Sequence, residues 1–267
     1  MKIGAKAIRT TAVSAANADT IVVRGFDLCR ELIGHVTFTD HAWLLVCGSL
    51  PAPAQRRVLD STLIAIAEHG IVPSVAAARM TLAAAPEAMQ GAVAAGILGC
   101  GSVILGSAEA AARLFADVHA RGSTAGAGDA ARAVIAETRS ARRAIAGYGH
   151  PLHKQSDPRV ERLLGVASEA GLSGRHVEIA LEIERLLPDI TGKPLAMNVS
   201  GAIAAVLLDA GYPLLAVKGI PILARTAGLL AHLLEEQDHP IGFVLADTGA
   251  SGITYDGPAP AGFVPGD

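Results

Sequence analysis

The segment that decides the fold is GYGHPLHKQSDPR, residues 147–159. It places two histidines three residues apart, after two glycines and before an Asp-Pro-Arg sequence. Glycine lets a backbone approach a ligand closely, and proline suits the first turn of a helix, where its missing N–H costs nothing. We therefore expect a polar loop that faces a ligand, followed by a helix that begins at Pro158 with Asp157 as its N-cap.

On both sides of this loop the sequence is helical in pattern. Of the 267 residues, 51% are apolar and only 3% aromatic, so the core must be built from Ala, Leu, Val and Ile. Alanine favours helix because it loses no side-chain entropy there. Apolar spacing and capping residues predict an all-α chain with about a dozen helices and no internal repeat.

Strand signals are few, and residues 20–25 read as a short strand or an extended arm. Asp40 and Asp129 are expected as N-caps, Pro188 as a helix stop, 122–128 as a flexible loop, and the tail from Asp247 as extended. The predicted helices cover 26–33, 40–47, 54–68, 73–84, 87–98, 107–120, 129–145, 158–171, 175–187, 198–210 and 218–236.

Composition excludes several classes of protein. A net charge of −3 and few aromatic residues argue against a nucleic-acid partner. Three cysteines without metal-binding spacing indicate buried thiols in a reducing compartment. The N-terminus lacks the apolar stretch of a signal peptide, and the apolar region 80–115 is interrupted by Glu87, Gln90 and glycines. We expect a soluble cytoplasmic protein with no membrane contact, and a homo-oligomer with an apolar interface.

Common cofactor motifs are missing. No phosphate-binding Walker sequence, dinucleotide fingerprint or nucleophile elbow occurs. His150 and His153 have spacing that allows them to bind a metal from one turn, but no second cluster completes a site, so no metal is expected.

Five more segments accompany the opening loop in a recognisable order: RGFDL at 24–28, WLLVCGSLP at 43–51, EHGIVPS at 68–74, NVSGA at 198–202 and LARTAGLLAH at 223–232. Together they resemble the citrate synthase superfamily, and most of all its short citryl-CoA lyase branch, which is similar to the C-terminal module of ATP-citrate lyase. The resemblance implies a large helical domain (residues 1–106 and 216–267) and a small inserted helical domain (107–215). It also implies an active site in the cleft between them, and a homodimer.

The resemblance also implies a reaction and its residues. The family joins or cleaves a carbon–carbon bond between the methyl group of acetyl-CoA and the carbonyl of a 2-oxo acid such as oxaloacetate. By position, His69 and His150 match donors to the substrate oxygen, and Arg159 and Arg225 match arginines that bind its carboxylates. Further matches are Asn198 at the substrate and, facing coenzyme A, Gly147, Tyr148, Gly149 and Lys154.

Two residues depart from the family pattern. Ser200 stands where the family has its general-base aspartate, and Ile104 stands where the long synthases have a second histidine. Three interpretations remain open. Ser200 orients a water or substrate group while His153 transfers the proton, or the substrate's own carboxylate or hydroxyl assists. Alternatively, the protein is a degenerate paralogue that binds CoA thioesters or carboxylates without catalysis. A purely structural helical protein would bind neither.

Overall fold

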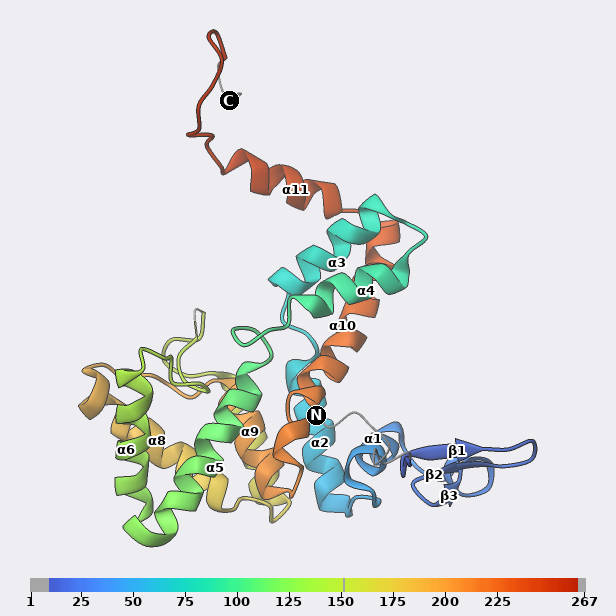
Figure 1. Ribbon diagram of the computed structural model, residues 1–267, viewed down its shortest axis with the longest axis vertical. Coiled ribbons are helices and arrows are strands. Elements are labelled where there is room, and N and C mark those ends of the chain that lie inside the picture. The colour runs from blue at the N-terminus through green and yellow to red at the C-terminus, as the bar shows by residue number, and fades with distance from the viewer. Residues whose placement is uncertain (1–9, 151, 264–267) are drawn as a thin grey trace, which may run out of the picture.

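The structure, a computed structural model, describes residues 10–150 and 152–263 (Figure 1). Helices dominate these residues, as the all-α prediction required. The strands are β1 (Ser14–Ala16), β2 (Ile21–Val23) and β3 (Phe26–Asp27). The helices are α1 (Phe38–Cys47), α2 (Pro53–Ala67), α3 (Pro73–Ala84), α4 (Met89–Leu98), α5 (Ser107–Ala125), α6 (Ala127–Ser140), α7 (Pro158–Glu169), α8 (Arg175–Thr191), α9 (Val199–Asp209), α10 (Gly219–Asp238) and α11 (Gly242–Ser251), with short turns η1 (Leu28–Leu32) and η2 (Leu214–Ala216).

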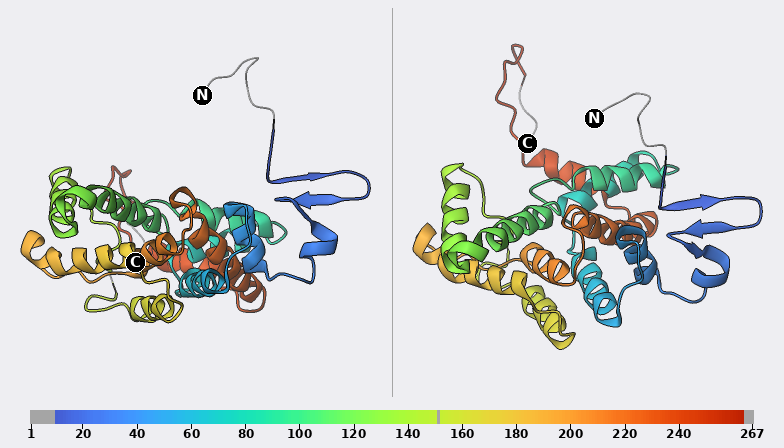
Figure 2. Two further views of the ribbon diagram at one scale, coloured as in Figure 1. Left: turned by 90° about the horizontal axis from the view of Figure 1, so that it is seen from below. Right: turned by 60° about the horizontal axis from the view of Figure 1, so that its bottom comes forward.

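A small antiparallel sheet in the order β1-β2-β3 occupies the N-terminal region. The strand expected at residues 20–25 is confirmed, but the helix expected at 26–33 is instead β3 followed by the π-helical turn η1. Asp27 causes the change, because its carboxylate caps the N–H groups of Cys29 and Arg30. Figure 2 shows the β1–β2 hairpin projecting away from the helices.

Several helix ends differ from the predictions, and α1, α5 and α6 show how the residue that caps a helix decides where it begins or ends. Thr37, not Asp40, is the N-cap of α1, with Asp40 completing a capping box from the third helical position. Residues 122–128 are not a loop, since α5 runs to Ala125 and only Gly126, at φ 82°, separates it from α6. Asp129 therefore lies inside the first turn of α6 rather than at its cap.

Pro188 does not end its helix. α8 continues to Thr191 and is closed by Gly192 in the left-handed conformation. A proline inside a helix costs about 3 kcal/mol, but Ile183, Leu186 and Leu187 are fully buried around it, and each buried aliphatic side chain contributes about 1.5–3 kcal/mol. Packing thus outweighs the local penalty. The tail is also not extended from Asp247, because α11 includes that residue.

Two groups of helices pack separately and α2 contacts both. Helices α5 to α9 form one group around the almost entirely buried α9, while α3, α4, α10 and α11 form the other. α2 packs on α10 and also on α7 and α9 (Figure 1). The domain boundaries at 107 and 215 stay a prediction.

One helical stretch among the described residues, Leu214–Asp238, is long and apolar enough to cross a membrane by length and mean hydropathy alone. That is weak evidence, because a central helix of a protein core passes the same test. This stretch carries the buried ionisable residues Arg225 and Glu236, which have partners within the protein.

Candidate active site

Three imidazole rings from two distant segments meet in one cluster. His69 lies in the loop between α2 and α3, whereas His150 and His153 lie in the loop before α7. The ring centroids of His69 and His150 are 5.7 Å apart, those of His69 and His153 5.5 Å, and those of His150 and His153, which are stacked, 4.7 Å. All three rings are half-buried. The fold therefore brings together the two histidines that the sequence predicted and adds a third.

His150 is held as a hydrogen-bond donor. Its Nδ1 accepts the backbone N–H groups of Leu152 (3.1 Å) and His153 (3.0 Å), so in the neutral ring the proton resides on Nε2. Burial lowers the pKa of His150, and the positive charges of His153 and Arg159 lower it further. With its proton on Nε2, the ring offers an N–H, as needed to polarise a carbonyl or hydrogen-bond a hydroxyl.

Arg159 is positioned by the residue that begins its own helix. Asp157 caps α7 and pairs with the guanidinium through two hydrogen bonds, Nε to Oδ1 at 2.9 Å and Nη2 to Oδ2 at 2.8 Å. The same carboxylate accepts the N–H of Val199 at the start of α9. Burial alone would raise the pKa of Asp157, but the bonds from Arg159 and the backbone hold it below its ordinary value. The predicted N-cap is confirmed, and it fixes the direction of Arg159.

Arg225 is a buried guanidinium without adequate partners. Its side chain is 3% exposed, and Nη2 donates to the carbonyl of Ile66 at a long 3.3 Å. The nearest carboxylate oxygen, on Glu68, is 3.9 Å from Nη1, and neither Nε nor Nη1 has a hydrogen-bond partner among the described residues. A buried charge left unpaired is strongly unfavourable, so the binding of a carboxylate by Arg225 stays a prediction that its surroundings favour.

The two guanidinium groups act on the same histidine. Burial is the first cause of the lowered pKa of His69, and the positive charges of Arg159, His153 and Arg225 add to it. Burial lowers the pKa of Arg225, and the positive charge of Arg159 lowers it further. His69 is thus within electrostatic reach of both arginines, and its ring lies 5.7 Å from that of His150, so the residues at positions 69, 150, 159 and 225 form one linked group.

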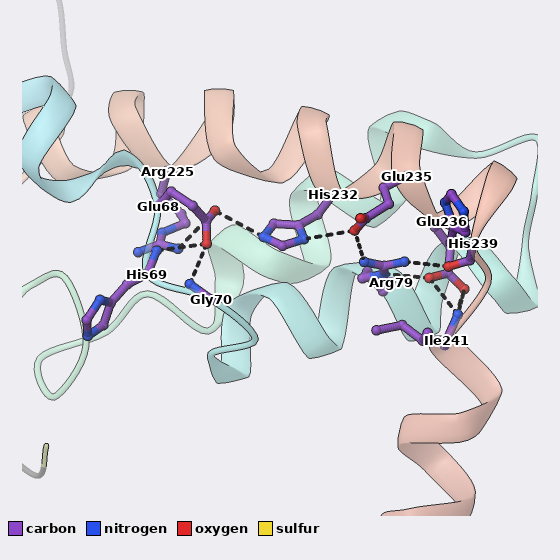
Figure 3. A network of polar contacts seen from close by, with 11 residues as sticks. Glu68, His69, Gly70, Arg79, Arg225, His232, Glu235, Glu236, His239 and Ile241 are labelled. Carbon is purple, nitrogen blue, oxygen red and sulfur yellow. Dashed lines mark hydrogen bonds and ion pairs between the residues drawn. The ribbon is translucent and has the colours of Figure 1, made fainter.

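Glu68 and His232, which the sequence did not single out as site residues, support this cluster (Figure 3). The carboxylate of Glu68 accepts the N–H groups of His69 (2.7 Å) and Gly70 (2.6 Å) and lies 3.1 Å from Nε2 of His232. Burial raises the pKa of Glu68, but the hydrogen bonds from His232, His69 and Gly70 outweigh burial, and the pKa is lowered. The loop of His69 is thus fixed by a carboxylate from the preceding residue, and only the fold shows that His232 holds it.

Ser200 lies at the start of α9 and meets a second serine. Ser107, the first residue of α5, donates to the hydroxyl oxygen of Ser200 at 2.9 Å. Asn198 is the N-cap of α9, and its amide also donates to the carbonyl of Gly149 at 2.8 Å. Its oxygen and its amide nitrogen thus both bind within the protein, and the expected contact of Asn198 with substrate stays a prediction.

The glycine-rich part of the loop is docked on the protein rather than open to a ligand. A Cβ on Gly147 would lie 2.9 Å from the Cα of Gly201, and its φ is +90°, so this glycine permits contact with α9. Tyr148 is 8% exposed and its hydroxyl donates to the carbonyl of Ala180 at 2.7 Å. Burial raises the pKa of Tyr148 well above its ordinary value. These contacts correct the expectation that Gly147 and Tyr148 face coenzyme A.

The remaining cofactor candidates lie at a hollow beside the loop. Lys154 and Gln155 line it together with Glu184 and the segment 194–196. Gly149, at φ 78°, donates to the carbonyl of Ala196 and holds the loop at this edge. Lys154 and Gly149 thus stay predictions for the binding of coenzyme A. Among residues 10–150 and 152–263, no group of three metal-ligating side chains is placed to hold a metal ion.

Comparison with known proteins gives a consistent result. Residues 51–242 match the family model described as citrate synthase, C-terminal domain. The citrate synthase-like protein oryE of Aspergillus oryzae is 26% identical over 72% of this chain and 42% of its own length. Putative citrate synthase 2 of Mycobacterium tuberculosis is 28% identical over 70% of this chain and 49% of its own length. The chain thus spans about half the length of these curated relatives.

Solved structures extend the similarity to almost the whole chain. Citryl-CoA lyase from Hydrogenobacter thermophilus superposes with a TM-score of 0.84 at 29% identity, covering 97% of this chain and 98% of that one. The ATP citrate lyase of Methanosaeta concilii, solved with (3S)-citryl-CoA, superposes with a TM-score of 0.76 at 20% identity over 97% of this chain and 43% of that one. At that identity the likeness concerns the fold alone.

Proposed function

Because the chain belongs to the citrate synthase C-terminal domain family, we propose that it is an enzyme of citrate synthase type with citryl-CoA lyase activity. The reaction is the reversible cleavage of a 3-hydroxy-acyl-CoA such as citryl-CoA into acetyl-CoA and a 2-oxo acid such as oxaloacetate. The lyase is favoured over the synthase because the likeness to the Hydrogenobacter thermophilus citryl-CoA lyase is strong in both fold and sequence, with a TM-score of 0.84 at 29% identity.

The observation that carries the proposal is Arg225, a buried cation with two nitrogens unpartnered among the described residues, whose charge acts on His69 of the imidazole cluster. Guanidinium groups bind carboxylates through paired hydrogen bonds, and such charge-assisted bonds are the strong ones. In this proposal Arg225 and Arg159 hold the carboxylates of the substrate. His150 donates from Nε2 to the hydroxyl, which becomes the carbonyl on cleavage, and His69 donates to a neighbouring oxygen.

A second candidate function is binding without catalysis. It is favoured by Ser200, because its hydroxyl is hydrogen-bonded to Ser107 and has no adjacent base among the described residues to activate it. Such a paralogue would bind CoA thioesters and carboxylates through the same cationic cluster and leave them intact.

Purified protein with citryl-CoA separates the two. Release of oxaloacetate is followed by coupled oxidation of NADH, and binding of citrate and acetyl-CoA by calorimetry. The lyase predicts steady release that falls about 10²-fold or more in His150→Ala, with His119→Ala, an exposed histidine on α5, unchanged. Binding of both ligands without release, in the wild type and in Ser200→Asp, would establish the binder. If the protein binds neither citrate nor acetyl-CoA, both candidate functions are rejected.

We also propose a cytoplasmic homodimer. Large apolar side chains stay exposed along α10 and α11, namely Leu230, Leu234, Phe243 and Val244. Exposed apolar surface of this kind favours association. Light scattering coupled to gel filtration tests the proposal, with a monomer mass at micromolar concentration as the contrary result.

A further inference from the structure

We propose that His153 is the group that moves the proton at the α-carbon of the acyl-CoA, in place of the carboxylate that the chain lacks at position 200. The inference rests on the proposed lyase function and adds a residue role to it. Such a group is required, because cleavage of a 3-hydroxy-acyl-CoA releases a carbanion equivalent that must be protonated, and the reverse reaction must take that proton away.

Ser200 does not meet this requirement. Its hydroxyl accepts from Ser107, and its backbone N–H donates to Oδ1 of Asn198, the cap of α9. No imidazole or carboxylate hydrogen-bonds to either serine among the described residues. A serine hydroxyl without a base is too weakly acidic and too weakly basic to exchange a proton with carbon near neutral pH.

The nearby carboxylates are already committed. Asp157 accepts two hydrogen bonds from the guanidinium of Arg159 and two from backbone N–H groups. Glu68 accepts two backbone N–H groups and contacts His232. In each case the partners stabilise the ionised form and make it a poor proton acceptor.

Among the three imidazoles, His150 and His69 already face the oxygens and carboxylates of the substrate in the proposed function, which leaves His153. Nδ1 of His150 is occupied by two backbone N–H groups, so its Nε2 must carry the proton and act as donor. His69 lies under the fields of both Arg159 and Arg225, the pair suited to carboxylates. His153 has neither ring nitrogen hydrogen-bonded to any described residue, and its ring stacks on His150 at 4.7 Å.

That stacking places His153 where the chemistry needs it. The oxygen that His150 contacts and the α-carbon are two bonds apart in the hydroxy-acyl-CoA, so the proton donor for the carbon must lie beside the partner of the oxygen. His153 is also adjacent in sequence to Lys154, which lines the hollow proposed for coenzyme A.

The step balances without any further reactant. In cleavage, the hydroxyl proton leaves to solvent water while the Nε2–H of His150 hydrogen-bonds the oxygen, the C–O bond becomes a carbonyl, and the α–β carbon–carbon bond breaks. Its electron pair forms the enolate of acetyl-CoA, and protonated His153 gives its N–H proton to the enolate carbon. In synthesis, neutral His153 takes a methyl proton, and the enolate carbon attacks the carbonyl while His150 donates to the oxygen.

The test isolates this proton transfer from bond cleavage. Acetyl-CoA is incubated in D₂O with protein and with malate, which has the two carboxylates but lacks a reactive carbonyl, and loss of methyl protons is followed by NMR. His153→Ala is expected to slow exchange and citryl-CoA turnover about 10²-fold or more, with the KM for citryl-CoA unchanged within about twofold. Added imidazole restores part of the rate to His153→Ala, which a merely misfolded variant would not allow.

His153→Gln provides a second variant of similar size, and His119→Ala a matched control. If the wild type cleaves citryl-CoA and both His153 variants exchange and cleave at the wild-type rate, the inference is overturned while the proposed function stands. Loss of exchange in Ser200→Ala but not in His153→Ala assigns the proton to Ser200 and also overturns it. A wild type that neither exchanges nor cleaves removes the proposed function, and the inference with it.

Discussion

Two buried arginines on the packed helices α3 and α10 carry the same charge in opposite circumstances (Figure 3). Arg79 is 2% exposed, and all three of its nitrogens donate, to Glu236 (2.5 Å), Glu235 (2.6 Å) and the carbonyl of His239 (2.7 Å). Arg225 is 3% exposed, and Nε and Nη1 have no hydrogen-bond partner among the described residues. Every nitrogen of the first arginine has a partner within the fold, whereas two nitrogens of the second have none among the described residues and, in the proposed function, bind the substrate.

The difference shows how a structural cation is told from a functional one. Buried polar groups in folded proteins are almost always hydrogen-bonded, so each exception needs a reason. Glu236 also accepts the N–H groups of Ile241 and Gly242, and the Arg79 network thereby joins α10 to the start of α11. Around Arg225 the one carboxylate among the described neighbours, on Glu68, stays 3.9 Å from Nη1, and Arg159 adds a second positive charge.

Replacing Arg79, whose nitrogens all have partners, is expected to have the largest effect on stability. Arg79→Met leaves Glu236 buried without its counter-ion, which should lower the free energy of unfolding by about 3–5 kcal/mol. Urea unfolding followed by circular dichroism measures it. Arg57→Met, which removes an exposed ion pair with Glu169, is the control and should change stability by less than about 1 kcal/mol. Equal effects in both variants would contradict the distinction.

Replacing Arg225, the arginine with unpartnered nitrogens, should weaken ligand binding rather than stability. Arg225→Met removes an unpaired buried charge, so the unfolding free energy should hold or rise, whereas citrate affinity should fall by about 1.5–3 kcal/mol, roughly 10- to 150-fold. Calorimetry with citrate and urea unfolding give the two numbers. A variant that loses stability but keeps citrate affinity would make Arg225 structural and remove the main support for the site.

Tyr148 extends the comparison to a neutral group with a partner. Tyr148→Phe removes the hydrogen bond to the carbonyl of Ala180 and should lower the unfolding free energy by about 0.5–1.5 kcal/mol. Acetyl-CoA affinity should not change, because the hydroxyl is turned into the protein. Weaker acetyl-CoA binding at unchanged stability would restore Tyr148 as a cofactor residue.

The unpaired imidazoles should make stability depend on pH. The pKa values of His69 and His150 are lowered from the ordinary 6.5, so below that pH the unfolded chain binds more protons than the folded one. The free energy of unfolding should therefore fall as the pH drops below about 6.5 and level off beyond the folded-state pKa. Urea unfolding between about pH 7.5 and 5.5 tests this. The double variant His69→Gln/His150→Gln should make the unfolding free energy nearly independent of pH in this range. His35→Gln, which replaces an exposed histidine, should leave the pH dependence unchanged. An unchanged pH dependence in the double variant would show that the pKa values of His69 and His150 are not lowered by folding.

The helices with strong local signals follow directly from the sequence. Pro73 and Pro158 begin α3 and α7 where predicted, because a proline at the first helical turn is a signal contained in a few neighbouring residues. Pro188 failed as a stop because packing of Leu186 and Leu187 in the core, which no local window contains, held α8 together. Tyr148 failed as a cofactor residue for the same kind of reason, since its partner Ala180 is 32 residues away.

By itself the sequence determined an all-α chain of the citrate synthase family and named His69, His150, Arg159 and Arg225 as a set. Only the tertiary structure decided that Arg225 is buried with unpartnered nitrogens while Arg79 is complete, and that His153 stacks on His150 with both ring nitrogens available. The physical reason is the distance along the sequence over which the deciding contacts act. Helices and caps are set by contacts between residues three or four positions apart, whereas the satisfaction of a buried charge depends on every group the fold brings to it from elsewhere in the chain.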